Sequence, residues 1–100
     1  MDDRRPAVLT EIRSLLDLPA DAKLPPRATL EHTLTSGYAY ALGLEQQRVR
    51  LERRLRTLLR SADDAKPGEM SALTGELAEA ERELAGVRAL LAEFREQTFS

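Results

Sequence analysis

The sequence predicts an all-α protein: a long antiparallel coiled-coil hairpin with a short N-terminal helix packed at its open end. Two seams of mostly apolar residues, spaced alternately three and four apart, lead to this prediction, because that spacing keeps one helix face against another. The first seam consists of Leu30, Leu34, Gly37, Ala41, Leu44, Arg48, Leu51, Leu55, Leu58 and Ala62. The second consists of Met70, Leu73, Leu77, Ala80, Leu84, Val87, Leu91, Phe94 and Thr98. A composition that is 42% hydrophobic but only 4% aromatic indicates a helical core of Leu and Ala.

The N-terminal helix is expected over residues 5–17, and a connector over residues 18–27. One apolar face is formed by Val8, Leu9, Ile12, Leu15 and Leu16. Pro6 suits the first turn of this helix, and Pro19 ends it, because a proline inside a helix removes a hydrogen bond. Three prolines make the connector stiff and prevent it from continuing as a regular helix.

The two long helices are expected over residues 26–62 and 67–97, with a turn at 63–66. The 100 residues would then form a single helical domain. A tight turn makes the numbers of facing residues add up to about 128, which places Leu91 opposite Gly37. Large residues of one helix would meet small residues of the other.

The two flanks of the predicted hairpin differ. One is charged, and its register brings Arg54 near Glu76. The other is apolar, and its residues are the candidate protein interface: Tyr38, Leu42, Val49, Leu59, Ala78, Ala85 and Ala92. The N-terminal helix is expected to cover the part at the open end, comprising Tyr38, Leu42, Ala85 and Ala92. The rest of this flank, formed by Val49, Leu59 and Ala78, is expected to be covered by a partner, either a second copy or another protein. The alternative is that these are scattered exposed apolar residues.

A basic stripe of arginines lies on the outside of the second helix, formed by Arg50, Arg53, Arg56 and Arg60. It could bind phosphates or an acidic partner, or it could be an ordinary solvated face. No aromatic residues alternate with these arginines to stack on bases, and the net charge of the chain is −2. Nucleic acid is therefore not the expected partner.

An acidic pair, Asp63 and Asp64, lies at the tip of the predicted hairpin. Such a pair could hold Mg²⁺ together with a partner's ligands, or it could simply favour the turn. A coiled-coil hairpin with an acidic tip is similar in architecture to the bacterial transcript-cleavage factors that enter the secondary channel of RNA polymerase. This resemblance implies, as an alternative function, a transcription-associated factor that acts on polymerase or nucleic acid through the tip or the arginines.

Arg48 and two glycines leave alternatives open, whereas the single histidine does not. Arg48 interrupts the seam, either to specify register or with its stem over Ala80 and its guanidinium directed to solvent or Glu45. Two glycines, Gly37 and Gly43, indicate close helix approach, a kink, or an approaching partner. The single histidine, His32, is expected on the surface.

The residues predict no enzyme, no cofactor and no metal site, because there is no cysteine, no second histidine and no phosphate-binding loop. The predicted function is a non-enzymatic protein interaction module, an adaptor or regulatory subunit that forms a homodimer or higher oligomer. No run of eighteen apolar residues occurs, so a cytoplasmic protein without membrane contact is expected. Thirteen arginines against two lysines suggest a GC-rich bacterial genome.

Overall fold

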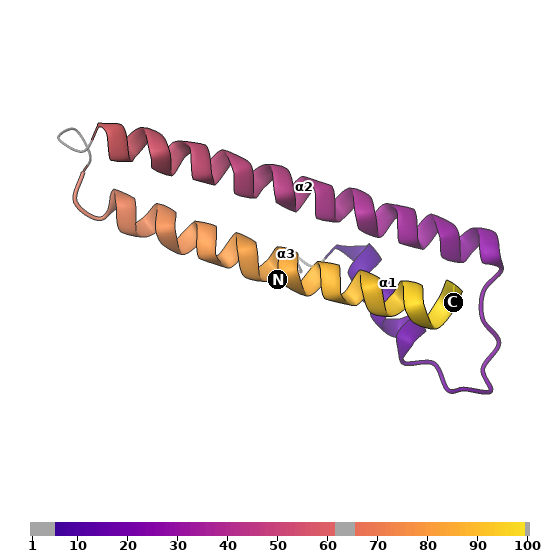
Figure 1. Cartoon of the computed structure of the whole chain (residues 1–100). Helices are drawn as coiled ribbons and strands as arrows, with labels where there is room; N and C mark the ends of the chain where they lie inside the picture. The colour runs from indigo at the N-terminus through magenta and orange to yellow at the C-terminus, as the bar shows by residue number, and fades with distance from the viewer. Residues whose placement is uncertain (1–5, 62–65, 100) are drawn as a thin grey trace. The chain divides into compact units, whose positions relative to one another are not determined.

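The structure, a computed structural model, describes residues 6–61 and 66–99 and confirms the all-α class. Within those residues it has three helices and no strand: α1 (Ala7–Leu16), α2 (Arg27–Arg60) and α3 (Glu69–Phe99) (Figure 1). Residue contacts divide the chain into two compact units. Met1–Ala41 together with Gly86–Ser100 form one, called here the three-helix unit, and Leu42–Ala85 form the other, called the two-helix unit.

The first two helices each begin directly after a proline. The Pro6 carbonyl accepts a hydrogen bond from the Leu9 N–H at 3.1 Å, and the Pro26 carbonyl accepts one from the Leu30 N–H at 3.1 Å. Each proline is therefore the last residue before a helix, where its missing N–H is not needed. α1 consequently begins at Ala7, and Pro6 precedes its first turn.

The third helix begins two residues later than predicted, at Glu69. Gly68 has a φ of +90°, a backbone conformation that disfavours any residue with a β-carbon. The Gly68 carbonyl accepts the hydrogen bond of the Ala72 N–H at 2.9 Å, and the Glu69 carboxylate accepts one from the Lys66 N–H at 3.4 Å. Pro67 thus belongs to a turn that ends where α3 starts.

The core of the three-helix unit forms around Gly37. Phe94 and Ile12 are both 0% exposed, and Leu91 is 1% exposed. A β-carbon added to Gly37 would lie 2.5 Å from Leu91 Cδ2 and 3.3 Å from Ile12 Cδ1. The predicted pairing of Leu91 with Gly37 is therefore confirmed, and close approach is the reason for this glycine.

The prediction of which face α1 covers is wrong. Ile12 of α1 packs at Gly37, and the carboxylate of Glu11 accepts a hydrogen bond from the hydroxyl of Thr33. Tyr38 and Ala92, which the prediction places beneath α1, remain exposed, Tyr38 at 44%. Because Gly37 has no side chain, there is room for Ile12, and α1 packs against the face of α2 that carries residues 33 and 37.

Thr33 is a buried polar residue that links α1 to α2. It is 3% exposed, and its hydroxyl lies 3.1 Å from both a carboxylate oxygen of Glu11 and the Thr29 carbonyl. We expect Thr33→Val to lower the free energy of unfolding by about 0.5–1.5 kcal/mol, because a helix-linking hydrogen bond is lost. Urea unfolding of this variant beside Thr35→Val, an exposed threonine on the same helix, measures the effect. Equal stability of the two variants would contradict the role of Thr33.

The two-helix unit has a thinner core. Its buried apolar residues are Leu44, Leu73, Ala80 and Leu84. The seam residues nearer the turn, including Leu51, Leu55 and Leu58, are half-buried. Here α2 and α3 lie side by side, and Gln47 of α2 shares a surface depression with Ala80 of α3. This pairing agrees with the predicted register.

Candidate interaction surface

The structure leaves the apolar flank of the two-helix unit largely open to solvent. Leu42 is 56% exposed and Leu59 is 58% exposed, which is unusual for large apolar side chains. Ala85 is exposed, and Val49 and Ala78 are half-buried. We call these five residues the flank surface.

Charged residues also lie along this side of α2, beside the residues predicted to form an apolar flank. Nη1 of Arg48 donates a hydrogen bond to Oε1 of Glu52 at 2.6 Å, and Nη2 of Arg48 lies 3.8 Å from Oε1 of Glu45. Nη2 of Arg56 lies 3.7 Å from Oε2 of Glu52. The four residues follow one another at steps of three and four, so their charges neutralise one another along one helix face.

The guanidinium of Arg48 points away from the seam, as one of the two alternatives predicts. Its side chain is 27% exposed, and its guanidinium reaches Glu45 and, at shorter distance, Glu52. The sequence prediction named solvent or Glu45, and it did not include Glu52. Two carboxylates on one guanidinium keep the head group outside the core while the stem remains partly covered.

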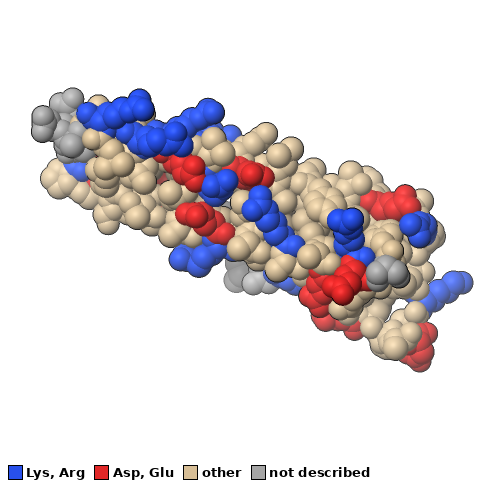
Figure 2. All heavy atoms as spheres, viewed as in Figure 1, with Lys and Arg blue, Asp and Glu red and all other residues tan. Residues whose placement is uncertain are grey.

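All four residues of the predicted basic stripe are exposed, and Lys and Arg side chains gather over the C-terminal part of α2 (Figure 2). Of the four, Arg56 has a carboxylate partner. Among the described residues, no carboxylate lies within ion-pairing distance of Arg50, Arg53 or Arg60. Arg60, in the last turn of the helix, also interacts favourably with the helix dipole.

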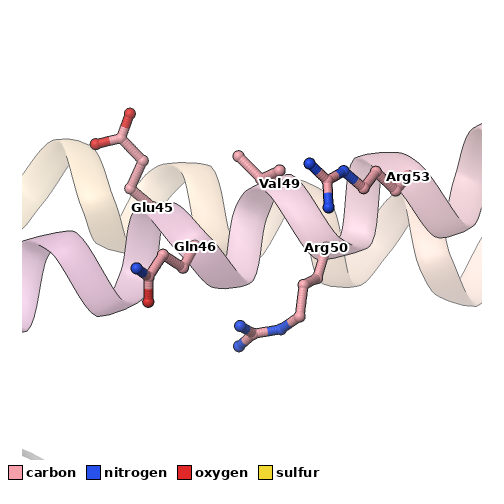
Figure 3. A pocket seen from close by; sticks show the side chains of 5 residues that line it. All are labelled: Glu45, Gln46, Val49, Arg50 and Arg53. Carbon is pink, nitrogen blue, oxygen red and sulfur yellow. The ribbon is translucent and has the colours of Figure 1, made fainter.

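A shallow depression of about 380 Å³ lies beside Val49. Its five lining residues all belong to α2, and the guanidinium of Arg53 extends back toward Val49 (Figure 3). They are Glu45, Gln46, Val49, Arg50 and Arg53. A hollow formed by one helix cannot enclose a small molecule, so this feature belongs to an extended surface.

The opposite flank carries its charges on separate helices. A depression of about 270 Å³ is lined by Gln47, Glu76, Glu79, Ala80 and Glu83. The expected ion pair between Arg54 and Glu76 is absent from the salt bridges of the described residues. The prediction of that pair is wrong, since an exposed interhelical pair gains little over hydration of the two groups.

The remaining candidates are the acidic pair at the predicted tip and the single histidine. Asp63 and Asp64 lie outside the described residues. His32 is exposed, and within residues 6–61 and 66–99 no three His, Cys, Asp or Glu side chains group closely enough to hold a metal ion.

None of the described helices combines the length and the apolar character that crossing a bilayer requires. Comparison with protein-family models, curated protein sequences and solved structures finds no match to this chain.

Proposed function

We propose that this chain is a non-enzymatic protein interaction module that self-associates through the flank surface of its two-helix unit. The exposure of Leu42 and Leu59, each more than half open to solvent, is the observation that supports the proposal. Fully burying a leucine side chain is worth about 1.5–3 kcal/mol. When two copies shield this surface from water, both leucines are buried in each of the two chains.

The test introduces charge into the flank surface without touching the core. We expect a Leu42→Lys and Leu59→Lys double variant to weaken self-association at least tenfold, or about 1.4 kcal/mol, because each lysine would have to lose its hydration in the interface. Sedimentation equilibrium measures the dissociation constant. A matched control is Gln47→Lys with Thr57→Lys, which adds the same charge to exposed positions of α2 outside the flank surface. Equal weakening in both double variants would contradict the proposal.

A transcription-associated role is the second candidate function. It is favoured by the guanidiniums of Arg50, Arg53 and Arg60, which have no carboxylate partner among the residues that the structure describes. For this role we expect the chain to be retained on DNA or RNA. The retention should fall steeply with salt and be lost on charge reversal at Arg53 and Arg56. Equal behaviour of wild type and the charge-reversed variant would contradict this role.

A further inference from the structure

We propose that α2 of the two-helix unit carries a second interaction surface, which binds an acidic helix of a partner protein. It consists of four arginines, and we call it the arginine surface: Arg50, Arg53, Arg54 and Arg60. This inference goes beyond the proposed self-association and does not depend on it, since it rests on charge rather than on the exposed leucines.

The four guanidiniums of the arginine surface have no partner within the chain. All four side chains are exposed, and among residues 6–61 and 66–99 none of them forms a salt bridge or a side-chain hydrogen bond. Like charges three and four residues apart on a helix repel one another. An anionic partner that neutralises them relieves this repulsion, so the surface favours negative charge.

The carboxylates nearest along α2 do not neutralise this surface. Glu45 and Glu52 are the only acidic residues of the part of α2 within the two-helix unit, and both pair with Arg48, while Glu52 also pairs with Arg56. These ion pairs leave the positive charge of the arginine surface uncompensated on its own helix.

The arginine surface lies on the side of α2 that is turned away from α3. At about 100° per residue, its four positions fall within about 120° of the helix circumference. The half-buried seam residues Leu51, Leu55 and Leu58 occupy the other side. A partner helix can therefore lie on the arginines without disturbing the pairing of α2 with α3.

The spacing of the arginines fits a helical partner. Arg50 precedes Arg53 by three residues and Arg54 by four, and Arg60 follows Arg53 by seven. Glutamates at steps of three, four and seven share one face of a helix and rise along it by the same amounts. Each guanidinium can bind a carboxylate through two parallel hydrogen bonds.

A concave feature adjoins two of these arginines. The depression of about 380 Å³ beside Val49 includes Arg50 and Arg53 in its lining (Figure 3). The methylene groups of a glutamate can rest on Val49 while its carboxylate meets a guanidinium. A basic side chain of a partner would meet like charge there.

The surrounding charges favour a short acidic helix over nucleic acid. The part of α3 within the two-helix unit carries five glutamates and one arginine, a net charge of −4. The arginine surface is only about 15 Å long, whereas a DNA duplex carries a charge about every 1.7 Å of its axis and extends past the arginines toward those carboxylates. The two-helix unit also has no aromatic residue on which bases could stack.

Binding of a synthetic helix to the full-length chain tests the inference. The probe is a fluorescent alanine-based peptide of about 20 residues with glutamates at steps of three and four, and fluorescence anisotropy measures its dissociation constant. We expect the triple variant Arg50→Gln, Arg53→Gln and Arg60→Gln to bind at least about tenfold more weakly than wild type. Wild-type affinity should also fall at least about tenfold between about 0.05 M and 0.3 M NaCl.

The matched control is Arg13→Gln, Arg82→Gln and Arg95→Gln, which removes the same charge at exposed positions outside the arginine surface. Far-UV circular dichroism verifies that both triple variants remain helical. Equal weakening in the two variants, or no binding of the peptide by wild type at low salt, would overturn the inference.

Two further probes separate the alternatives. A peptide with glutamine in place of every glutamate should not bind, and equal binding of both peptides would overturn the role of charge. A DNA duplex of about 20 base pairs that binds wild type more tightly than the acidic peptide would overturn the protein partner and support the second candidate function. Self-association is measured separately by sedimentation, so its failure is distinguishable from a failure of the arginine surface.

Discussion

Phe94→Ala is expected to lower the free energy of unfolding by about 3–5 kcal/mol, the largest effect of any single truncation in this chain. Phe94 is 0% exposed, and its ring meets that of Phe99 edge to face, with the centroids 6.2 Å apart and the planes at 85°. Removing the ring eliminates its burial and leaves a cavity in the core of the three-helix unit. Small domains have only about 5–15 kcal/mol of total stability, so the three-helix unit would come close to unfolding.

Urea unfolding followed by far-UV circular dichroism measures this loss. Leu24→Ala is the matched control, because Leu24 belongs to the same unit and is 49% exposed. Its truncation should change stability by less than about 1 kcal/mol. A Phe94→Ala variant as stable as Leu24→Ala would contradict the core described for this unit.

Alanine at the two glycines of α2 is expected to change stability in opposite directions. At Gly43 nothing lies within 4 Å of an added β-carbon, so Gly43→Ala should stabilise the protein by about 0.5–1 kcal/mol through helix propensity alone. At Gly37 the added β-carbon would lie 2.5 Å from Leu91 Cδ2. Leu91 and Ile12 are fully enclosed and cannot turn toward solvent, so overpacking of about 1–3 kcal/mol outweighs the gain.

Thermal unfolding of the two single variants checks the opposite signs. Truncating the obstructing side chain provides the internal control: in a Leu91→Ala background, Gly37→Ala should cost much less, since only the 3.3 Å contact with Ile12 Cδ1 then remains. Double-variant cycles isolate this coupling. Equal stabilisation by Gly37→Ala and Gly43→Ala in the wild-type background would contradict the close approach at Gly37.

The sequence predicted the pairing of the long helices because a three-four seam and a short turn leave one register in which large meets small. Gly37 opposite Leu91 follows from that rule alone. The face that α1 covers could not be predicted from the sequence, since a ten-residue connector allows α1 to pack on either flank. Packing of Ile12 at Gly37 and the bond between Glu11 and Thr33, residues 22 apart, decide it.

The residues of the flank surface were predicted from their spacing, but of the ion pairs beside them only the contact between Arg48 and Glu45 was anticipated. Glu45, Arg48, Glu52 and Arg56 follow at steps of three and four, and this spacing could have revealed their ion pairs. The sequence led us instead to expect the exposed pair between Arg54 of α2 and Glu76 of α3. The observed pairs join residues three or four apart, which one helix face already places side by side, whereas an exposed pair between helices gains little.

Self-association is tested most directly by sedimentation equilibrium of the wild-type chain at low salt, over protein concentrations up to about 0.3 mM. We predict that the weight-average mass rises with concentration from the monomer mass of 11.2 kDa toward twice that value. A mass that stays at 11.2 kDa over the whole range would contradict the proposed function.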